Sequence, residues 1–193
     1  MPYIQPLTNN IFGLMPVNAI GGGDIETGLY SVSSSEATVP LPGDAIVLTS
    51  IGTVRVAVSA DVIQVLGAAA ATLSTASFAQ GTLNLLVYND PQQQYVISNT
   101  TSANMTLATI GQNVGLVTTS TGTGIPSTSL GIGRSKMALS ATVTTSAAPL
   151  RILGLHPVET FTSSMTGTTA SGGVFKWIVR LAPGDLQPSN LTT

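Results

Sequence analysis

Few residues in this chain of 193 amino acids could carry out chemistry. The lone histidine, His156, precedes Pro157, and cysteine is absent. A metal site needs clustered His, Cys or carboxylate ligands, and no nucleophile elbow G-x-S-x-G stands in the sequence to pair with this histidine. We therefore predict that His156 is a residue at the end of a strand, with no catalytic role.

Asp24 and Glu26 lie close together in GGGDIETG and could offer oxygen ligands to calcium. Two carboxylates fall short of the roughly six to eight oxygens that calcium takes. The eight acidic residues show no spacing that singles out a glycosidase pair. The segment GIGRSK, residues 131–136, lacks the spacing of a phosphate-binding loop. We predict no catalytic, metal or cofactor site, and so no enzyme.

The stretch LVYNDPQQQYVISN, residues 86–99, is open to two interpretations. Asp90 could be an exposed reactive carboxylate, or it could shape a turn between two strands. An Asp side chain accepts local backbone hydrogen bonds, and a following Pro fixes φ for a turn. We favour the turn, with Tyr88 and Tyr95 on the flanking strands.

Charged residues make up 7% of the chain, against about 25% in a typical soluble domain. The net charge of −2 offers no basic field for nucleic acid and no basic stripe for an anionic membrane. Soluble monomers usually depend on surface charge. We therefore expect partner proteins to cover much of this surface.

The elements that would position these residues are strands, and the fold is predicted to be all-β. Residues 45–50 and 53–58 have the spacing of a hairpin with a two-residue loop, although Ile51 is a poor residue for a left-handed turn position. Residues 105–110 and 113–119 suggest a second hairpin. Further expected strands cover 82–88, 94–98, 137–145, 150–155 and 174–182.

Regularly spaced short strands favour a β-sandwich, a jelly roll or a small barrel. In the last expected strand, Trp177 and Val179 share one face and Lys176 and Arg180 the other. Residues 118–133 are predicted to form a surface loop. The sequence shows no internal repeat and no linker between domains.

Prolines and a Gly triplet mark residues 1–24 as an extended arm, followed by a β-rich body, 25–185, and a tail, 186–193. Phe12, Leu14 and Met15 either fold back on their own body or dock on a neighbouring subunit. Arg134 and Lys136 form either a solvated or an interfacial pair. These five residues are the candidate interface.

The ordered set PLPGDAIVLTSIGTVRVAV, LLVYNDPQQQYVIS, ATIGQN, PLRILGL and VFKWIVRL resembles a family of small virion structural proteins of tailed bacteriophages. This family includes capsid cement, or decoration, proteins. The similarity runs from about residue 12 to 181. Members often end in an asparagine–histidine pair, whereas this chain continues with APGD at 182–185.

The resemblance implies an all-β decoration module at the capsid surface of the virion. Its partners would be the major capsid protein and further copies of itself, as a homodimer or homotrimer. It assigns no functional residue. The main alternative is a tail fibre, spike or adhesin-like module that binds the host surface, and an unrecognised hydrolase is a third hypothesis.

Overall fold

A computed structural model describes residues 13–19, 22, 24–32, 38–58, 65–71, 83–100, 105–117, 135, 137–144, 148–157 and 175–182. The strands are β1 (Met15–Ala19), β2 (Gly28–Ser31), β3 (Ala45–Leu48), β4 (Val54–Val56), β5 (Val65–Ala69), β6 (Asn84–Tyr88), β7 (Gln93–Ser98), β8 (Asn113–Val117), β9 (Ala138–Thr144), β10 (Leu150–Leu155) and β11 (Lys176–Leu181). One 3₁₀ turn, η1 (Leu107–Thr109), is the helical element of this described part. The predicted all-β fold is confirmed.

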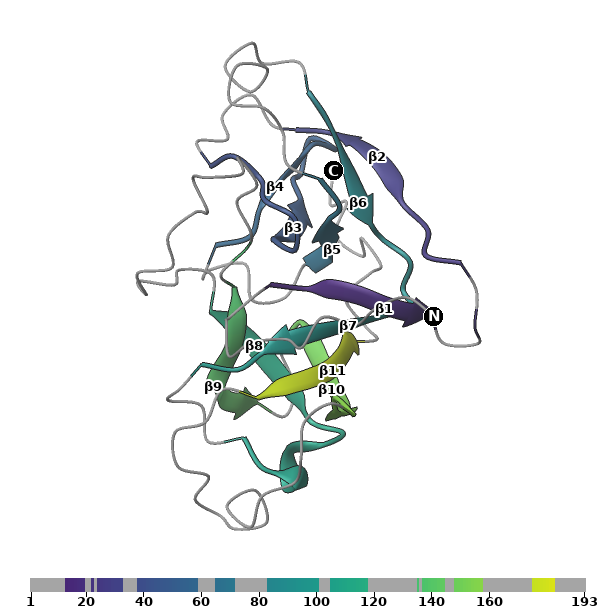
Figure 1. Ribbon diagram of the computed structural model, residues 1–193. Helices are drawn as coiled ribbons and strands as arrows, with labels where there is room; N and C mark the ends of the chain where they lie inside the picture. Colours follow the sequence, from purple (N-terminus) through teal and green to yellow (C-terminus); the bar gives the residue numbers. More distant parts are fainter. Residues whose placement is uncertain are drawn as a thin grey trace, which may run out of the picture.

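The strands form two antiparallel sheets, and Figure 1 shows them as two lobes. One sheet has the order β2-β6-β5-β3-β4, and the other has the order β1-β7-β11-β10-β8-β9. In each sheet a parallel bridge links the first and third of five consecutive strands: Val32, after β2, pairs with Val54 of β4, and Asn99, after β7, pairs with Leu139 of β9. Each set of five strands thereby curls on itself, and β1 lies outside the second set, paired with β7. We call β2–β6 barrel 1 and β7–β11 barrel 2.

The two barrels have the same topology. Numbered in chain order, the strands of both lie in the order first, fifth, fourth, second, third. The hydrogen bonds that extend the pairing of the first strand with the fifth also match: Val32 N donates to Leu83 O over 2.8 Å, and Asn99 N donates to Phe175 O over 3.1 Å. The chain therefore contains one module twice, which the sequence analysis missed.

Equivalent turns precede the second strand of each barrel. In 41–44, Asp44 N donates to Leu41 O, and Gly43 has a φ of 88°. In 109–112, Gln112 N donates to Thr109 O, and Gly111 has a φ of 84°. A positive φ at the third residue is typical of a type II turn, and glycine adopts it without strain.

The core positions also correspond in space. Strand registers match Ile46 with Val114, Val54 with Leu139, Leu85 with Trp177 and Val87 with Val179, and all eight side chains are fully buried. Burial of these apolar side chains is the main stabilising contribution to each barrel. Trp177 and Val179, which were predicted to share one face of the last strand, both lie in the core, and Lys176 on the other face is also buried.

Two local predictions are wrong. Residues 105–110 form no strand; they contain η1 and the turn before β8. The β3–β4 hairpin has a three-residue loop, because Gly52 N donates to Thr49 O and Gly52 takes the left-handed conformation with a φ of 80°. Gly52, and not Ile51, therefore occupies the position that disfavours a β-branched residue.

Candidate functional site

The candidate catalytic residues do not come together. Asp24 and Glu26 are exposed before β2, whereas His156 follows β10 and its backbone N–H donates to Lys176 O over 2.9 Å. Within the described ranges, no group of three His, Cys, Asp or Glu residues could hold a metal ion.

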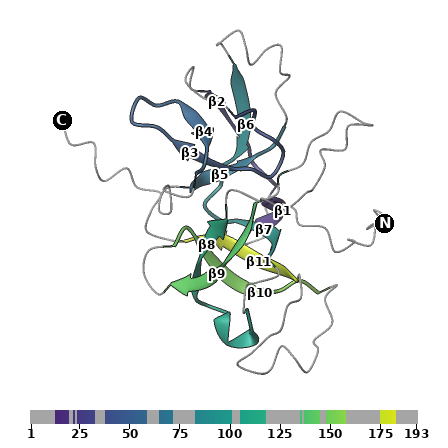
Figure 2. The ribbon, with the colours of Figure 1, turned by 90° about the vertical axis from the view of Figure 1, so that its left-hand side faces the viewer.

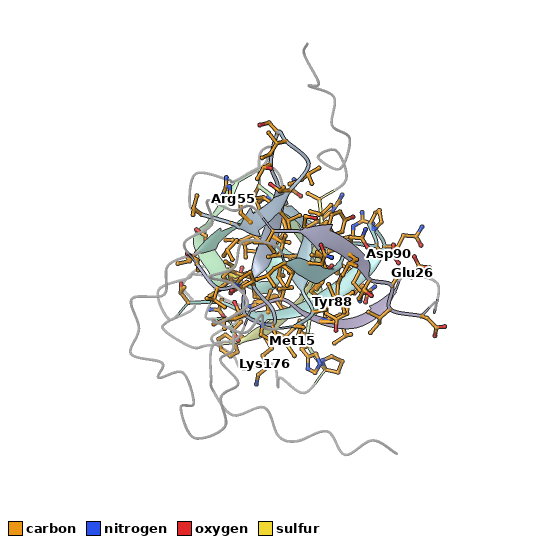
Figure 3. The ribbon with its side chains drawn as sticks, turned by 90° about the horizontal axis from the view of Figure 1, so that it is seen from above. Met15, Glu26, Arg55, Tyr88, Asp90 and Lys176 are labelled. Carbon is orange, nitrogen blue, oxygen red and sulfur yellow. The ribbon has the colours of Figure 1, made fainter. Side chains whose placement is uncertain are left out.

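Asp90 lies in the turn that joins the two barrels. Gln93 N donates to Asp90 O over 3.0 Å, and the Asp90 carboxylate accepts a 2.7 Å hydrogen bond from Gln92 N. The turn predicted from Asp-Pro is confirmed, but its flanking strands β6 and β7 belong to different sheets. In the view of Figure 3, Asp90 lies on the same side of the molecule as Glu26.

A second contact stabilises this connection between β6 and β7. The Tyr95 hydroxyl of β7 donates to the Tyr88 carbonyl oxygen of β6 over 2.8 Å. Burial raises the pKa of Tyr95 above its ordinary value, so the phenol keeps its proton and can act as this donor.

The barrels also meet at a buried seam, which consists of residues 13–14, 41–45, 135 and 137. The turn 41–44 of barrel 1 lies at its centre. Pro42 O accepts from Ser135 N at 3.2 Å, and Gly43 O accepts from Leu14 N at 2.8 Å. The backbone N–H of Ala45 lies 3.1 Å from the Met137 sulfur.

Asp44 holds the seam turn from within. Its side chain is buried and accepts hydrogen bonds from Leu41 N, at 2.8 Å, and from Ser135. Burial raises the pKa of the carboxyl group, and the two hydrogen bonds partly offset this increase. The Gly43-Asp44 pair thus has a structural role at the seam.

The structure places two of the five candidate interface residues. Leu14 is fully buried in the core of its own chain, and Met15 is exposed on β1. Strand β1 pairs with β7, so this part of the predicted arm is a strand of the body. Phe12, Arg134 and Lys136 lie outside the described residues, as do the predicted loop 118–133 and the tail 186–193.

Large apolar side chains are exposed at four places. The outer strip carries Ile25, Leu29 and Leu86, and Leu29 pairs directly with Leu86 across β2 and β6. Strand β1 adds Met15 and Val17. The β3–β4 hairpin carries Leu48, Ile51 and Val58, and Ile110 is exposed on the turn 109–112 of barrel 2. Apart from Met15, sequence patterning did not single out these residues as exposed, because an apolar residue on a half-exposed strand has the same pattern as a core residue.

In the described part of the chain, no helix is long and apolar enough to cross a membrane. No known protein family matches the sequence, and no curated protein matches it. The function is therefore inferred from the surface and from the resemblance described above.

Proposed function

We propose that this protein is a capsid cement, or decoration, protein of a tailed bacteriophage. It would bind the outside of the shell of major capsid protein and bridge neighbouring capsomers, as a homodimer or homotrimer. The resemblance of its ordered motifs to this family supports the proposal, as does the low charge content of 7%.

The observation that carries the proposal is the outer strip. Leu29 is 63% exposed on β2 and lies beside Leu86, which is 43% exposed on β6. An apolar pair on a surface with so few charges is typical of a protein-binding face. Its partner would be an apolar, weakly charged surface of the shell.

A cement protein does not need tight binding at each copy. When one oligomer contacts several capsomers, the second contact forms at a high effective concentration. Modest burial of the outer strip in each copy would then hold the shell together. Faces with few charges assist this role, because they pack without burying unpaired ions.

The test is co-sedimentation of the purified protein with empty shells of the major capsid protein, followed by electron cryomicroscopy. We expect ordered density on the outer shell surface. The double substitution Leu29→Ser/Leu86→Ser should weaken binding on the order of tenfold for each leucine. The matched control is Thr27→Ser, at the exposed residue just before β2, and this variant should bind as the parent does. Unchanged binding of the double variant, or location of the protein at the tail, would contradict the proposal.

The contribution of the arm to shell binding can be tested by deletion, and the structure indicates where the deletion should end. Removing residues 1–23 would delete buried Leu14 and all of β1. Removing residues 1–12 leaves both in place. If the arm reaches a neighbouring subunit, the shorter deletion should weaken shell binding at an unchanged melting temperature.

A further inference from the structure

The seam between the barrels joins two unlike surfaces. Barrel 1 contributes the turn 41–44, whereas barrel 2 contributes Ser135 and Met137, just before β9. Residues 13–14, which precede both barrels, also contact this turn through the hydrogen bond from Leu14 N to Gly43 O. If the barrels were related by a two-fold axis, each would contribute both a turn and a segment before its third strand to the interface. The seam is instead heterologous: barrel 1 contributes only its turn, and barrel 2 contributes only its segment. The corresponding segment of barrel 1 and the corresponding turn of barrel 2 are therefore not used by the seam.

Strand registers identify the unused halves. The turn 109–112 is the barrel 2 equivalent of 41–44, with matching hydrogen bonds to Ile152 and to Ala69 respectively. Leu48 pairs with Val54 as Leu116 pairs with Leu139, and Ser50 and Gly52 precede Val54 by as many residues as Ser135 and Met137 precede Leu139. The hairpin tip 50–52 therefore stands in barrel 1 at the same place before the third strand as the segment that fills the seam.

Both unused halves are open. Ile51 on the tip is 77% exposed, and Ile110 on the turn is 42% exposed. A Cβ atom added at Gly52 or Gly111 would meet nothing within 4 Å, whereas one added at Gly43 would lie 3.4 Å from Leu14 backbone atoms. Figures 1 and 2 place the β3–β4 hairpin in one lobe and η1, next to the turn 109–112, at the far end of the other.

We propose that the tip 50–52 of one copy packs against the turn 109–112 of a second copy, so that the seam within the chain is repeated between chains. We infer that a second copy binds the turn 109–112, because the tip 50–52 corresponds in position to residues 135 and 137, which contact the equivalent turn 41–44 within the chain. Neither half contains a charged residue, so the contact buries two isoleucines without burying an ion. A heterologous contact closes into a ring or continues as a filament. This inference rests on the duplicated geometry and not on capsid binding.

The test is sedimentation velocity of the full chain, over a concentration series, with two variants. We expect the parent to associate beyond the monomer in a concentration-dependent manner. Ile51→Asp and Ile110→Asp should each be monomeric, because each lacks one half of the contact. An equimolar mixture of the two variants should form a dimer and nothing larger, because one intact tip meets one intact turn.

The equimolar mixture distinguishes the proposed tip-to-turn contact from other contacts between copies. If the contact were two-fold, mixing would restore nothing, and the proposal would be wrong. A monomeric parent, or a variant that associates as the parent does, would also overturn it. Thr27→Asp, at an exposed residue outside both halves, should associate like the parent. Ile51→Ser and Ile110→Ser provide the same test without added charge should an aspartate variant lower the melting temperature.

Discussion

Barrel 1 and barrel 2 share one topology but differ in what covers them. In barrel 2, β1 pairs with β7, and Val96 on β7 is 2% exposed. In barrel 1, no strand of the described ranges pairs with the equivalent edge of β2, and Leu29, which matches Val96 in register, is 63% exposed. The edge of the first strand is therefore covered by β1 in barrel 2, whereas the equivalent position in barrel 1 is exposed at Leu29.

The equivalent turns differ in the same way. Asp44 is buried at the seam, while its counterpart Gln112 is exposed. The apolar surface of this protein therefore arises where one copy of the module lacks the neighbour that the other copy has. Substitutions at matched positions can test how much each neighbour contributes.

The largest effect is expected from Gly13→Ala at the seam. The added Cβ would overlap Gly43 O and the Ser135 side chain. Overpacking of this kind costs about 1–3 kcal/mol, and we expect the upper end because a backbone oxygen is involved. The free energy of unfolding, from urea titration, measures it. Gly154→Ala is the control, since its Cβ meets no atom within 4 Å, and it should change stability by less than about 0.5 kcal/mol. Equal effects would contradict the close approach at residue 13.

The next effect compares the two turns. Asp44→Ala removes the acceptor of Leu41 N and of Ser135, and a lost charge-assisted hydrogen bond costs about 1.5–3 kcal/mol. Gln112→Ala, at the exposed equivalent position, should cost less than about 0.5 kcal/mol. Thermal and urea unfolding of both variants would measure the difference. Similar losses would mean that the seam adds nothing to the turn.

A smaller effect concerns pH. Because burial raises the pKa of Asp44 in the folded state, the folded protein holds this proton more tightly than the unfolded chain does. The contribution of Asp44 to stability should therefore rise as pH falls through its folded pKa, and it should be lost again as pH rises. Asp44→Asn removes this titration, so the parent should gain stability relative to the variant between neutral pH and about pH 4. A gap in melting temperature that does not vary with pH would contradict this account.

The smallest change in the free energy of unfolding is expected in the turn between β6 and β7. Asp90→Ala removes the hydrogen bond from Gln92 N, which lies in an exposed turn, and should cost about 0.5–1 kcal/mol. Shell binding should not change, because Asp90 shapes a turn. Loss of shell binding with an unchanged melting temperature would instead make Asp90 a binding residue.

Much of the strand content could be predicted from alternation, because side chains on one face of a strand share one environment. The strands around Val54, Tyr95, Ile152 and Trp177 follow this pattern. The failure at 105–110 has a local cause: MTLATI is apolar enough for a strand, but the chain must turn there to enter β8. Alternation does not encode that requirement.

The duplication was hidden because equivalent positions share burial but not residue type. Leu85 matches Trp177 and Ala69 matches Ile152. The loops also differ: residues 49–53 connect β3 to β4, while residues 118–137 connect β8 to β9. The one local signal is LPGDAIVL against TIGQNVGL, residues 41–48 and 109–116, which share the turn glycine and a leucine. Two shared residues are too few to reveal a repeat.

The central claim is that two copies of one module form a single body through the seam. Urea unfolding followed by two signals tests it most directly. Trp177 is the only tryptophan and reports on barrel 2, whereas far-ultraviolet circular dichroism reports on both barrels. We predict that the two signals change together in one transition for the parent and separate in Gly13→Ala. Two separate transitions in the parent would contradict the claim.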